Sequence, residues 1–291
     1  MNSPFAYPSR FIEQGKLRQH YLDVGAGEPV LMVHGNPTWS YYYRNVVDAL
    51  SPRYRCIVPD HMGCGLSDKP SEEQYAFRLR DRINDLTALM KSLEITEPVT
   101  LVVHDWGGMI GLAWAMENNI PIKRLVILNT AGFPLPRRKT FPFRLWLGRN
   151  TSIGAWLIGR HNVFVRHAAN IGVKRHPLPD DVREWYVKPY ENRADRTAVL
   201  KFVQTIPLKP TDEGYDIVKA VGESMGRYDK TPMLICWGLK DFVFDRHFLK
   251  EWERRFPRAE VHRYPDCGHY ILEDAAEDVI PLITRFLEKN P

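Results

Sequence analysis

The chain has 291 residues, of which 44% are hydrophobic and 26% charged, and this is the balance of an ordinary globular protein. A chain of this length can bury a large core and does not depend on disulfides for stability. Its formal net charge of +5 is too small and too evenly spread to indicate a nucleic-acid partner. The densest basic stretch, Arg137-Arg138-Lys139 with Arg144 and Arg149 beyond it, is interpreted as the solvated start of a helix, and an anionic partner is the alternative.

The cysteines and the N-terminus bear on the compartment. Cys56, Cys64, Cys236 and Cys267 show no metal-ligand spacing, and we expect neither a metal nor a cofactor. Unpaired thiols fit a reducing environment. The N-terminus lacks the charged start and apolar core of a signal peptide, and no run approaches the roughly 18 apolar residues of a membrane span. The sequence therefore predicts a cytoplasmic protein without a membrane span, and it leaves the oligomeric state open.

Short apolar runs alternate with helical patterns through most of the chain, which is typical of a mostly parallel sheet wrapped by helices. Continuous apolar strands suit a sheet that is covered on both faces. The predicted strands are residues 30–34, 55–59, 99–104, 124–129, 233–237 and 260–264. An earlier run at 17–23 alternates and is predicted as an antiparallel edge strand. The predicted helices are residues 39–50, 79–93, 106–118, 246–256 and 274–289.

The alternation breaks between residues 129 and 233, where helical patterns and aromatic residues replace the strands. We predict a core domain formed by residues 1–133 and 215–291, and a helical cap domain formed by residues 134–214. The cap is expected over the carboxyl edge of the sheet, where ligands bind in open α/β sheets. Its aromatic residues are predicted to form mainly the core of the cap, and the alternative for a few of them is to line a pocket. They are Trp146, Trp156, Phe164, Trp185, Tyr186 and Phe202.

The chemistry begins at Val-His-Asp-Trp-Gly-Gly, residues 103–108, which follows an apolar run and opens a helical pattern. A strand-to-helix turn of this kind, a nucleophile elbow, holds its reactive side chain exposed at the edge of a sheet. A carboxylate is ionised at neutral pH and can attack carbon without a base, which leaves a covalent ester. Asp105 is therefore predicted to be the nucleophile of an enzyme, and His104 beside it to be structural.

An aspartyl ester needs a histidine to activate water and an acid to orient that histidine. In this architecture the acid follows a late strand and the histidine comes last. Asp241 lies in a turn just past the run at 233–237, and His269 follows a glycine shortly before the last helix. His269 is predicted to be the base and Asp241 the acid. Asp245 is the alternative acid, although it is expected to cap the next helix.

The first loop reads His-Gly-Asn-Pro-Thr-Trp at residues 34–39. Its glycine lets the backbone N–H of Asn36 face a developing negative charge, and the backbone N–H of Trp106 is its counterpart in the predicted oxyanion hole. The Asn36 amide and the Trp106 indole can also donate hydrogen bonds. These donors suit an anionic leaving group such as halide. The alternatives are a plain turn residue at Asn36 and a packing residue at Trp106.

These motifs, with Gly-His at 268–269, resemble those of haloalkane dehalogenases over nearly the whole chain. The resemblance implies an α/β-hydrolase fold, in which helices flank a mostly parallel sheet and a helical cap is inserted after the sixth strand. It also implies that Asn36 and Trp106 bind the halide. One subfamily carries a glutamate after the sixth strand, where this chain has Asn129-Thr130. With Asp241 as the acid, the chain resembles the third subfamily instead.

Members of that third subfamily are similar to the β-lactone decarboxylases of bacterial long-chain olefin biosynthesis, which share the same catalytic set. Two hypotheses follow from the resemblance, both with a small apolar substrate. The first is hydrolytic dehalogenation of a haloalkane to an alcohol and a halide ion through an alkyl ester on Asp105. The alternative is decarboxylation of a cis-3,4-dialkyl β-lactone to an alkene and carbon dioxide.

Other members of the superfamily resemble the chain less. Epoxide hydrolases also use an aspartate nucleophile, but their cap supplies two tyrosines. Tyr186, Tyr190 and Tyr215 lie in or beside the predicted cap and keep this alternative open. Fluoroacetate dehalogenases carry an arginine where this chain has Trp106. A non-catalytic binding protein is disfavoured because the chain retains the whole catalytic set.

Overall fold

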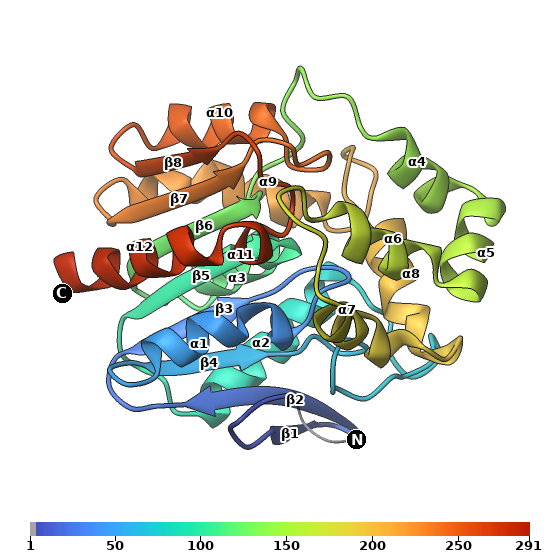
Figure 1. Ribbon diagram of the computed structural model, residues 1–291, viewed down its shortest axis with the longest axis horizontal. Helices are drawn as coiled ribbons and strands as arrows, with labels where there is room; N and C mark the ends of the chain where they lie inside the picture. The colour runs from blue at the N-terminus through green and yellow to red at the C-terminus, as the bar shows by residue number, and fades with distance from the viewer. Residues whose placement is uncertain (1–3) are drawn as a thin grey trace.

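The computed structural model describes residues 4–291 of the chain. Eight strands form one sheet in the order β1-β2-β4-β3-β5-β6-β7-β8 (Figure 1). Strands β3 to β8 pair in parallel, whereas β2 is antiparallel to both of its neighbours. The strands are β1 (Arg10–Gln14), β2 (Leu17–Val24), β3 (Pro29–Val33), β4 (Arg55–Pro59), β5 (Val99–Asp105), β6 (Ile122–Thr130), β7 (Met233–Gly238) and β8 (Glu260–Tyr264).

The run predicted as an edge strand is β2, which is antiparallel as expected but does not lie at the edge. Strand β1 pairs outside it, with Phe11 opposite His20. The prediction of the edge was wrong because β1 is short and largely exposed. It therefore carries no apolar run that a sequence pattern could reveal.

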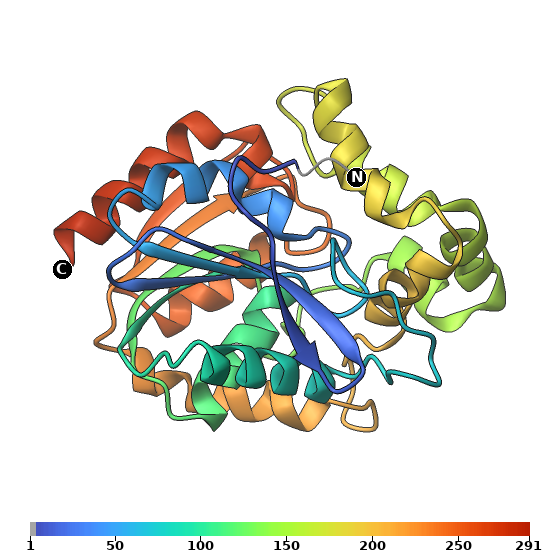
Figure 2. The same cartoon turned by 90° about the horizontal axis from the view of Figure 1, so that it is seen from below.

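Helices cover both faces of the sheet (Figure 2). Val30 and Met32 of β3 pack with α1 and α12 on one face, while Leu31 and Val33 pack with α2, α3, α9 and α10 on the other. This alternation is the period of two of a strand buried on both sides. These helices are α1 (Arg44–Leu50), α2 (Leu79–Ser92), α3 (Trp106–Glu117), α9 (Tyr215–Ser224), α10 (Arg246–Arg255) and α12 (Ala276–Lys289).

Five further α-helices follow β6 and lie beyond the carboxyl ends of the parallel strands (Figure 1). They are α4 (Phe143–Asn150), α5 (Ser152–His161), α6 (Val163–Ile171), α7 (Asp180–Val187) and α8 (Thr197–Gln204). Part of this group has its own apolar cluster around Ile158, Val165 and Val199. As predicted, the helical insertion follows the sixth strand.

A largely buried polar contact joins this insertion to helices α1 and α11. Glu273 of the short helix α11 (Ile271–Asp274) accepts two hydrogen bonds from the Arg44 guanidinium, at 2.5 and 2.9 Å. The hydroxyl of Tyr186 in α7 donates to the same carboxylate at 2.5 Å. Because charge-assisted bonds are stronger than neutral ones, this contact fixes α7 against α11 and α1. A separate observation concerns membranes. Among the helices of residues 4–291, none combines the length and the apolar composition that a membrane span requires.

Candidate active site

Asp105 lies at the junction where β5 ends and α3 begins at Trp106. Its backbone φ of 53° lies in a region that costs free energy for any residue with a side chain, and such strain is common at functional sites. The turn is tight, since a Cβ on Gly107 would lie 1.9 Å from the carbonyl oxygen of Val33. The hydroxyl of Thr130 donates to the carbonyl of Asp105. The predicted nucleophile elbow is therefore present and braced from β6.

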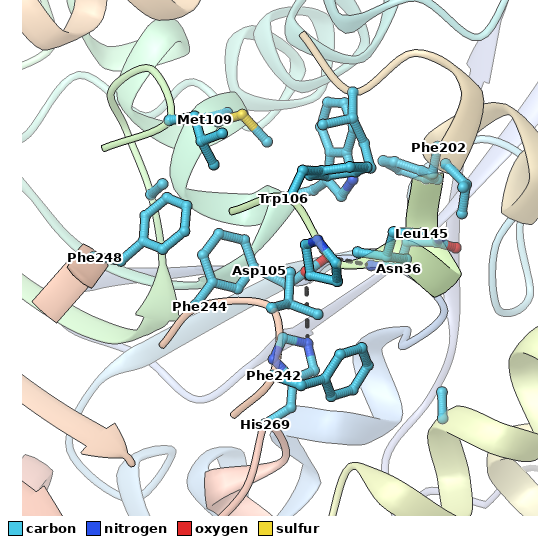
Figure 3. Close-up of a pocket in the computed structure, with 18 of the residues that line it drawn as sticks. Asn36, Asp105, Trp106, Met109, Leu145, Phe202, Phe242, Phe244, Phe248 and His269 are labelled. Carbon is cyan, nitrogen blue, oxygen red and sulfur yellow. Dashed lines mark hydrogen bonds and ion pairs between the residues drawn. The ribbon is translucent and has the colours of Figure 1, made fainter. Parts of the chain in front are cut away.

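The carboxylate of Asp105 is held between the first loop and the last one (Figure 3). Its Oδ1 accepts from the backbone N–H of Asn36 at 2.7 Å, and its Oδ2 lies 3.5 Å from Nε2 of His269. Burial raises the pKa of Asp105, while His269 and the backbone N–H groups of Asn36 and Trp106 act in the opposite direction. One oxygen is thus fixed by the backbone and the other faces the imidazole.

His269 and Asp241 form the predicted pair. Nδ1 of His269 lies 2.7 Å from Oδ2 of Asp241, whose other oxygen accepts from the backbone N–H groups of Val243 and Phe244 at 2.7 and 3.1 Å. Burial alone would lower the pKa of His269, but the charges of Asp241 and Asp105 raise it above the ordinary histidine value. The imidazole therefore lies between two carboxylates that favour its cationic form.

Asn129 is a member of the site that sequence reasoning passed over. Its side-chain amide donates to Oδ2 of Asp241 at 3.0 Å and to the carbonyl of Gly238 at 3.0 Å. It also accepts from the backbone N–H of Gly238 at 2.8 Å. The sequence marked this position only as the place where one subfamily has a glutamate. Its location at the end of β6, beside the acid, is the signal that could have revealed its contact.

Asn36 and Trp106 both line the cavity beside Asp105 (Figure 3). The Asn36 amide donates to the carbonyl of Val199 in α8 at 3.2 Å, which uses one of its two N–H groups. The insertion thereby orients a side chain of the first loop. Trp106 packs edge-on against Phe202 at 5.2 Å. The predicted pair of donors thus lies next to the predicted nucleophile, Asp105.

A buried guanidinium lies behind this pair. The Cζ atom of Arg82 is 3.6 Å from the ring centroid of Phe202 and 5.9 Å from that of Trp106. Arg82 is 1% exposed, and one of its N–H groups donates to the carbonyl of Phe77. Cations are attracted to aromatic faces. Because Arg82 forms no ion pair among residues 4–291, its charge favours an anion near Trp106.

The cavity above Asp105 is polar at one end and apolar along its walls. Asn36, Asp105 and His269 form the polar end, and Lys139, His167 and Tyr270 are the other charged or titratable side chains in the lining. The remaining lining is mainly aliphatic and aromatic, as in sites for apolar ligands. Its phenylalanines are Phe133, Phe141, Phe164, Phe202, Phe242, Phe244 and Phe248.

Asp245, the alternative acid, and His104, the predicted structural residue, both make structural contacts. The carboxylate of Asp245 accepts from the backbone N–H of His247 at 2.9 Å at the start of α10, so the prediction that it caps this helix is confirmed. The ring of His104 packs on Tyr42 at 4.4 Å, and its Nε2 lies 2.9 Å from the carbonyl of His269. His104 therefore contacts the loop that carries His269, which is consistent with its predicted structural role.

The tyrosines on which the epoxide hydrolase alternative rests do not line the cavity above the predicted nucleophile, Asp105. The Tyr186 hydroxyl is bound to Glu273, and the Tyr190 hydroxyl accepts from the backbone N–H of Gly65. Tyr215 lines a separate surface groove. Among residues 4–291, Tyr270 is the tyrosine that lines the cavity. The arrangement gives no pair of cap tyrosines to protonate an epoxide oxygen.

The cysteines are all buried as free thiols. Within the described part of the chain, no group of three or more histidine, cysteine or acidic side chains is placed to hold a metal ion. The glycine-rich stretch at residues 59–68 is a loop, in which Asp60 is buried against Nδ1 of His20 at 2.8 Å. It does not contribute to the cavity above Asp105.

The fold and the elbow define the class of the protein. The family model described as alpha/beta hydrolase fold matches residues 28–276, and the chain belongs to this family. An ancestral haloalkane dehalogenase superposes with a TM-score of 0.86 over 96% of this chain and 98% of that one, at 24% identity. A haloalkane dehalogenase from Agrobacterium tumefaciens gives 0.85 over 98% and 97%, at 22% identity. The predicted α/β-hydrolase fold is confirmed.

Relatives of higher identity narrow the comparison. The chain is 52% identical over 284 residues to a cis-3-alkyl-4-alkyloxetan-2-one decarboxylase of Shewanella oneidensis, which covers 98% of this chain and 89% of the relative. A protein of the same name from Xanthomonas campestris is 45% identical, over 98% and 97% of the two chains. Haloalkane dehalogenase 2 of Mycobacterium tuberculosis is 29% identical, over 97% of each. The resemblance to both groups is confirmed, and the chain is a member of a hydrolase-fold enzyme family.

Proposed function

We propose that this protein decarboxylates cis-3,4-dialkyl β-lactones (oxetan-2-ones) to an alkene and carbon dioxide. The observation that carries the proposal is the identity of 52% and 45% with two such decarboxylases over nearly the whole chain, against 29% with a dehalogenase. The sequence identities therefore favour decarboxylation, which the motifs gave only as the alternative to dehalogenation. The motifs could not rank the substrates because both groups share the same catalytic set.

In the proposed site, Asp105 is the nucleophile, His269 its cationic partner and Asp241 the acid that orients His269. Asn36 and Trp106 bind the leaving group. Residues 134–214 act as the cap over this site, on a core formed by residues 1–133 and 215–291. The phenylalanine-rich lining of the cavity supports a substrate with two alkyl groups, since apolar chains gain free energy when they leave water.

The first step is attack by Oδ2 of Asp105 on C4 of the lactone ring. The C4–O1 bond breaks, an ester forms, and the ring oxygen becomes part of a carboxylate attached to C3. Oδ1 of Asp105 stays on the backbone N–H of Asn36, 2.7 Å away. The free amide N–H of Asn36 and the indole N–H of Trp106 donate to the new carboxylate, and preorganised donors of this kind stabilise developing charge.

The second step returns the enzyme to its starting state. The C2–C3 bond breaks, carbon dioxide leaves, and the electron pair forms the C3–C4 double bond while the ester bond to Asp105 breaks. No water, oxidant or reductant is consumed. His269, whose pKa is raised by Asp241 and Asp105, supplies positive charge beside the departing carboxylate of Asp105. Inversion at C4 followed by anti departure gives the cis alkene from the cis lactone.

Dehalogenation is the second candidate because the Asn36 and Trp106 donors, with the Arg82 cation behind them, also suit a halide that leaves without a proton. In that reaction Asp105 displaces the halide and His269 activates a water molecule to hydrolyse the ester. The backbone N–H groups of Asn36 and Trp106 then receive the oxyanion. This route consumes water, whereas decarboxylation does not, and the products of the two reactions also differ.

A paired assay separates the two reactions. A cis-dialkyl β-lactone and a 1-bromoalkane of matched chain length are offered to one preparation, with Asp105→Ala as the inactive control. We expect alkene and carbon dioxide from the lactone, little bromide, and no ¹⁸O in the Asp105 peptide after single lactone turnovers in ¹⁸O-labelled water. Rapid bromide release with ¹⁸O in that peptide and negligible alkene would assign dehalogenation instead. Inactivity on lactone, halide, epoxide and ester panels would indicate a binding protein.

A further inference from the structure

Large exposed hydrophobic side chains are concentrated on the insertion after β6. Among residues 4–291, seven such side chains are exposed, and five of them lie between positions 143 and 163. We call these five the cap patch. They are Phe143 (72% exposed), Trp146 (46%), Ile153 (64%), Trp156 (54%) and Val163 (43%). The prediction that Trp146 and Trp156 belong to the core of the cap is therefore wrong.

The spacing of these residues explains their exposure. Phe143 and Trp146 are three residues apart on α4, and their rings stack at 5.9 Å with an angle of 14° between them. Ile153 and Trp156 have the same spacing on α5. Residues three apart share one face of a helix, so α4 and α5 each present an apolar pair outward. Both helices lie at the end of the molecule opposite the C-terminus (Figures 1 and 2).

The segment that carries the patch has charge of one sign, and Glu72, the acidic residue that lines a groove with Trp156 and Arg160, is paired with Lys201. Between Glu117 and Asp180 the chain has no acidic residue, although it has nine lysines and arginines there beyond position 130. Three of the nine pair with acids elsewhere, namely Lys139, Arg149 and Arg175. The other six are exposed and form no ion pair within the described part of the chain. They are Arg137, Arg138, Arg144, Arg160, Arg166 and Lys174.

We propose that the cap patch docks this protein on the surface of an anionic lipid bilayer. Tryptophan and phenylalanine insert at the level of the headgroups, where an aromatic ring is favoured, and the arginines contact the phosphates. A second copy of the chain fits this surface poorly. A two-fold interface would bring two uncompensated basic surfaces together. The basic stretch at residues 137–139, interpreted from the sequence as a solvated helix start, instead lies in a turn before α4. Arg137 lines a groove with Glu223 and Glu251 there, so this stretch is not counted as part of the surface.

The docking surface is continuous with the cavity above Asp105. Helix α4 contributes Leu145 to the cavity lining, and Phe141 and Pro142 just before it also line the cavity. The same stretch carries Phe143 and Trp146 on its outer side. Docking would therefore bring a bilayer next to the elements that enclose an apolar ligand. The proposed docking surface does not depend on whether the substrate is a β-lactone or a haloalkane.

Sedimentation with lipid vesicles tests the proposal. We expect the full chain to sediment with vesicles of phosphatidylglycerol and phosphatidylcholine, and far less with phosphatidylcholine alone. High salt should release it, because salt screens the attraction of the arginines to the headgroups. The double variant Trp146→Ser/Trp156→Ser, and separately Arg144→Glu/Arg160→Glu, should lower the partition coefficient about tenfold or more.

The chain offers matched controls on β1, an edge strand of the sheet, outside the cap patch. The side chain of Phe11 on β1 is 45% exposed, a fraction similar to that of Trp146. Arg10 is exposed and forms no ion pair among the described residues. Phe11→Ser and Arg10→Glu should bind vesicles like the unaltered protein. All variants should keep their melting temperature and their turnover of a short-chain, water-soluble substrate.

Three results would overturn the proposal. One is absence of the protein from anionic vesicles, and another is equal loss of binding in the patch variants and the Phe11 and Arg10 controls. The third is a dimer in light scattering that Trp146→Ser dissociates, in a protein that does not bind vesicles. That outcome would assign the surface to a second copy of the chain.

Discussion

The side-chain amide of Asn129 donates to Oδ2 of Asp241 at 3.0 Å, and the same oxygen lies 2.7 Å from Nδ1 of His269. The acid of the candidate triad is thus oriented from β6 as well as from its own loop. Asn129 also makes two hydrogen bonds with the backbone of Gly238. One side chain therefore connects the ends of β6 and β7 with the imidazole.

Asn129→Ala should weaken both the fold and the reaction. It leaves the buried N–H and carbonyl of Gly238 without these partners, which should cost about 2–4 kcal/mol in the free energy of unfolding. With less restraint on Asp241, we expect kcat to fall about tenfold or more while KM changes little. Urea unfolding and the pH profile of kcat measure the two effects. Unchanged stability and an unchanged profile would show that Asn129 does not position Asp241.

The sequence predicts the elements of this site well because the relevant signals are local. The strand, turn and glycines around Asp105 lie within a few residues of one another, and so do those around His269. The contacts that were missed join distant segments. Asn36 is held by Val199, 163 positions away, and Asn129 by Asp241, 112 positions away. The periodicity of a sequence does not indicate such contacts between distant segments, because they depend on how the strands are ordered in the sheet.

The same limit explains the errors in the fold. A helical pattern shows that Trp146 and Trp156 lie on particular faces of α4 and α5, but not which face meets the core. That choice depends on the packing of α4 and α5 against α8. The substrate is a further case, since Asp105, Asn36 and Trp106 suit either leaving group.

Gly35→Ala tests the close approach of the first loop to the proposed nucleophile, Asp105. A Cβ at position 35 would lie 2.0 Å from Oδ1 of Asp105, so either the loop or the carboxylate must move. A displacement of about 1 Å at a reacting group can cost on the order of a hundredfold in rate, and we expect at least that loss in kcat/KM. The readout is steady-state turnover.

Gly159→Ala is the matched control for this substitution. Position 159 lies in α5, and an added Cβ would meet nothing within 4 Å. Alanine is a better helix former than glycine by roughly 0.5–1 kcal/mol, so stability should rise slightly and turnover should not change. Equal activity of the two variants would contradict the close approach of Gly35 to Asp105.

Asp60 should make stability depend on acid pH. Burial alone would raise the pKa of Asp60, but His20, His34 and the backbone N–H of Leu66 bring it down to about 2. Because the folded pKa lies below the unfolded value of about 4, the stabilisation is complete above pH 4. It is lost as the pH falls through about 2, and it amounts to about 2–3 kcal/mol.

Asp60→Asn removes this linkage. The variant should be less stable than the unaltered protein by about 2–3 kcal/mol at pH 7 and by less at pH 3. Urea unfolding at both pH values gives the two differences. A difference that does not shrink toward pH 3 would show that the ionised Asp60 is not what stabilises the loop at residues 59–68.

His269→Ala distinguishes the two chemistries within one variant. An alkyl ester formed on Asp105 from a 1-bromoalkane has no carboxylate to lose, so only activated water can remove it. With His269 absent, that ester should accumulate, and intact mass should show one alkyl group per chain after about one equivalent of bromide is released.

The ester from a β-lactone carries its own leaving carboxylate and can still decompose. The same variant should therefore continue to form alkene from the lactone, more slowly because the cation beside Asp105 is gone. If lactone turnover in His269→Ala instead stops after one equivalent with a stable adduct, resolution of the ester requires water, and the decarboxylation route through Asp105 is wrong.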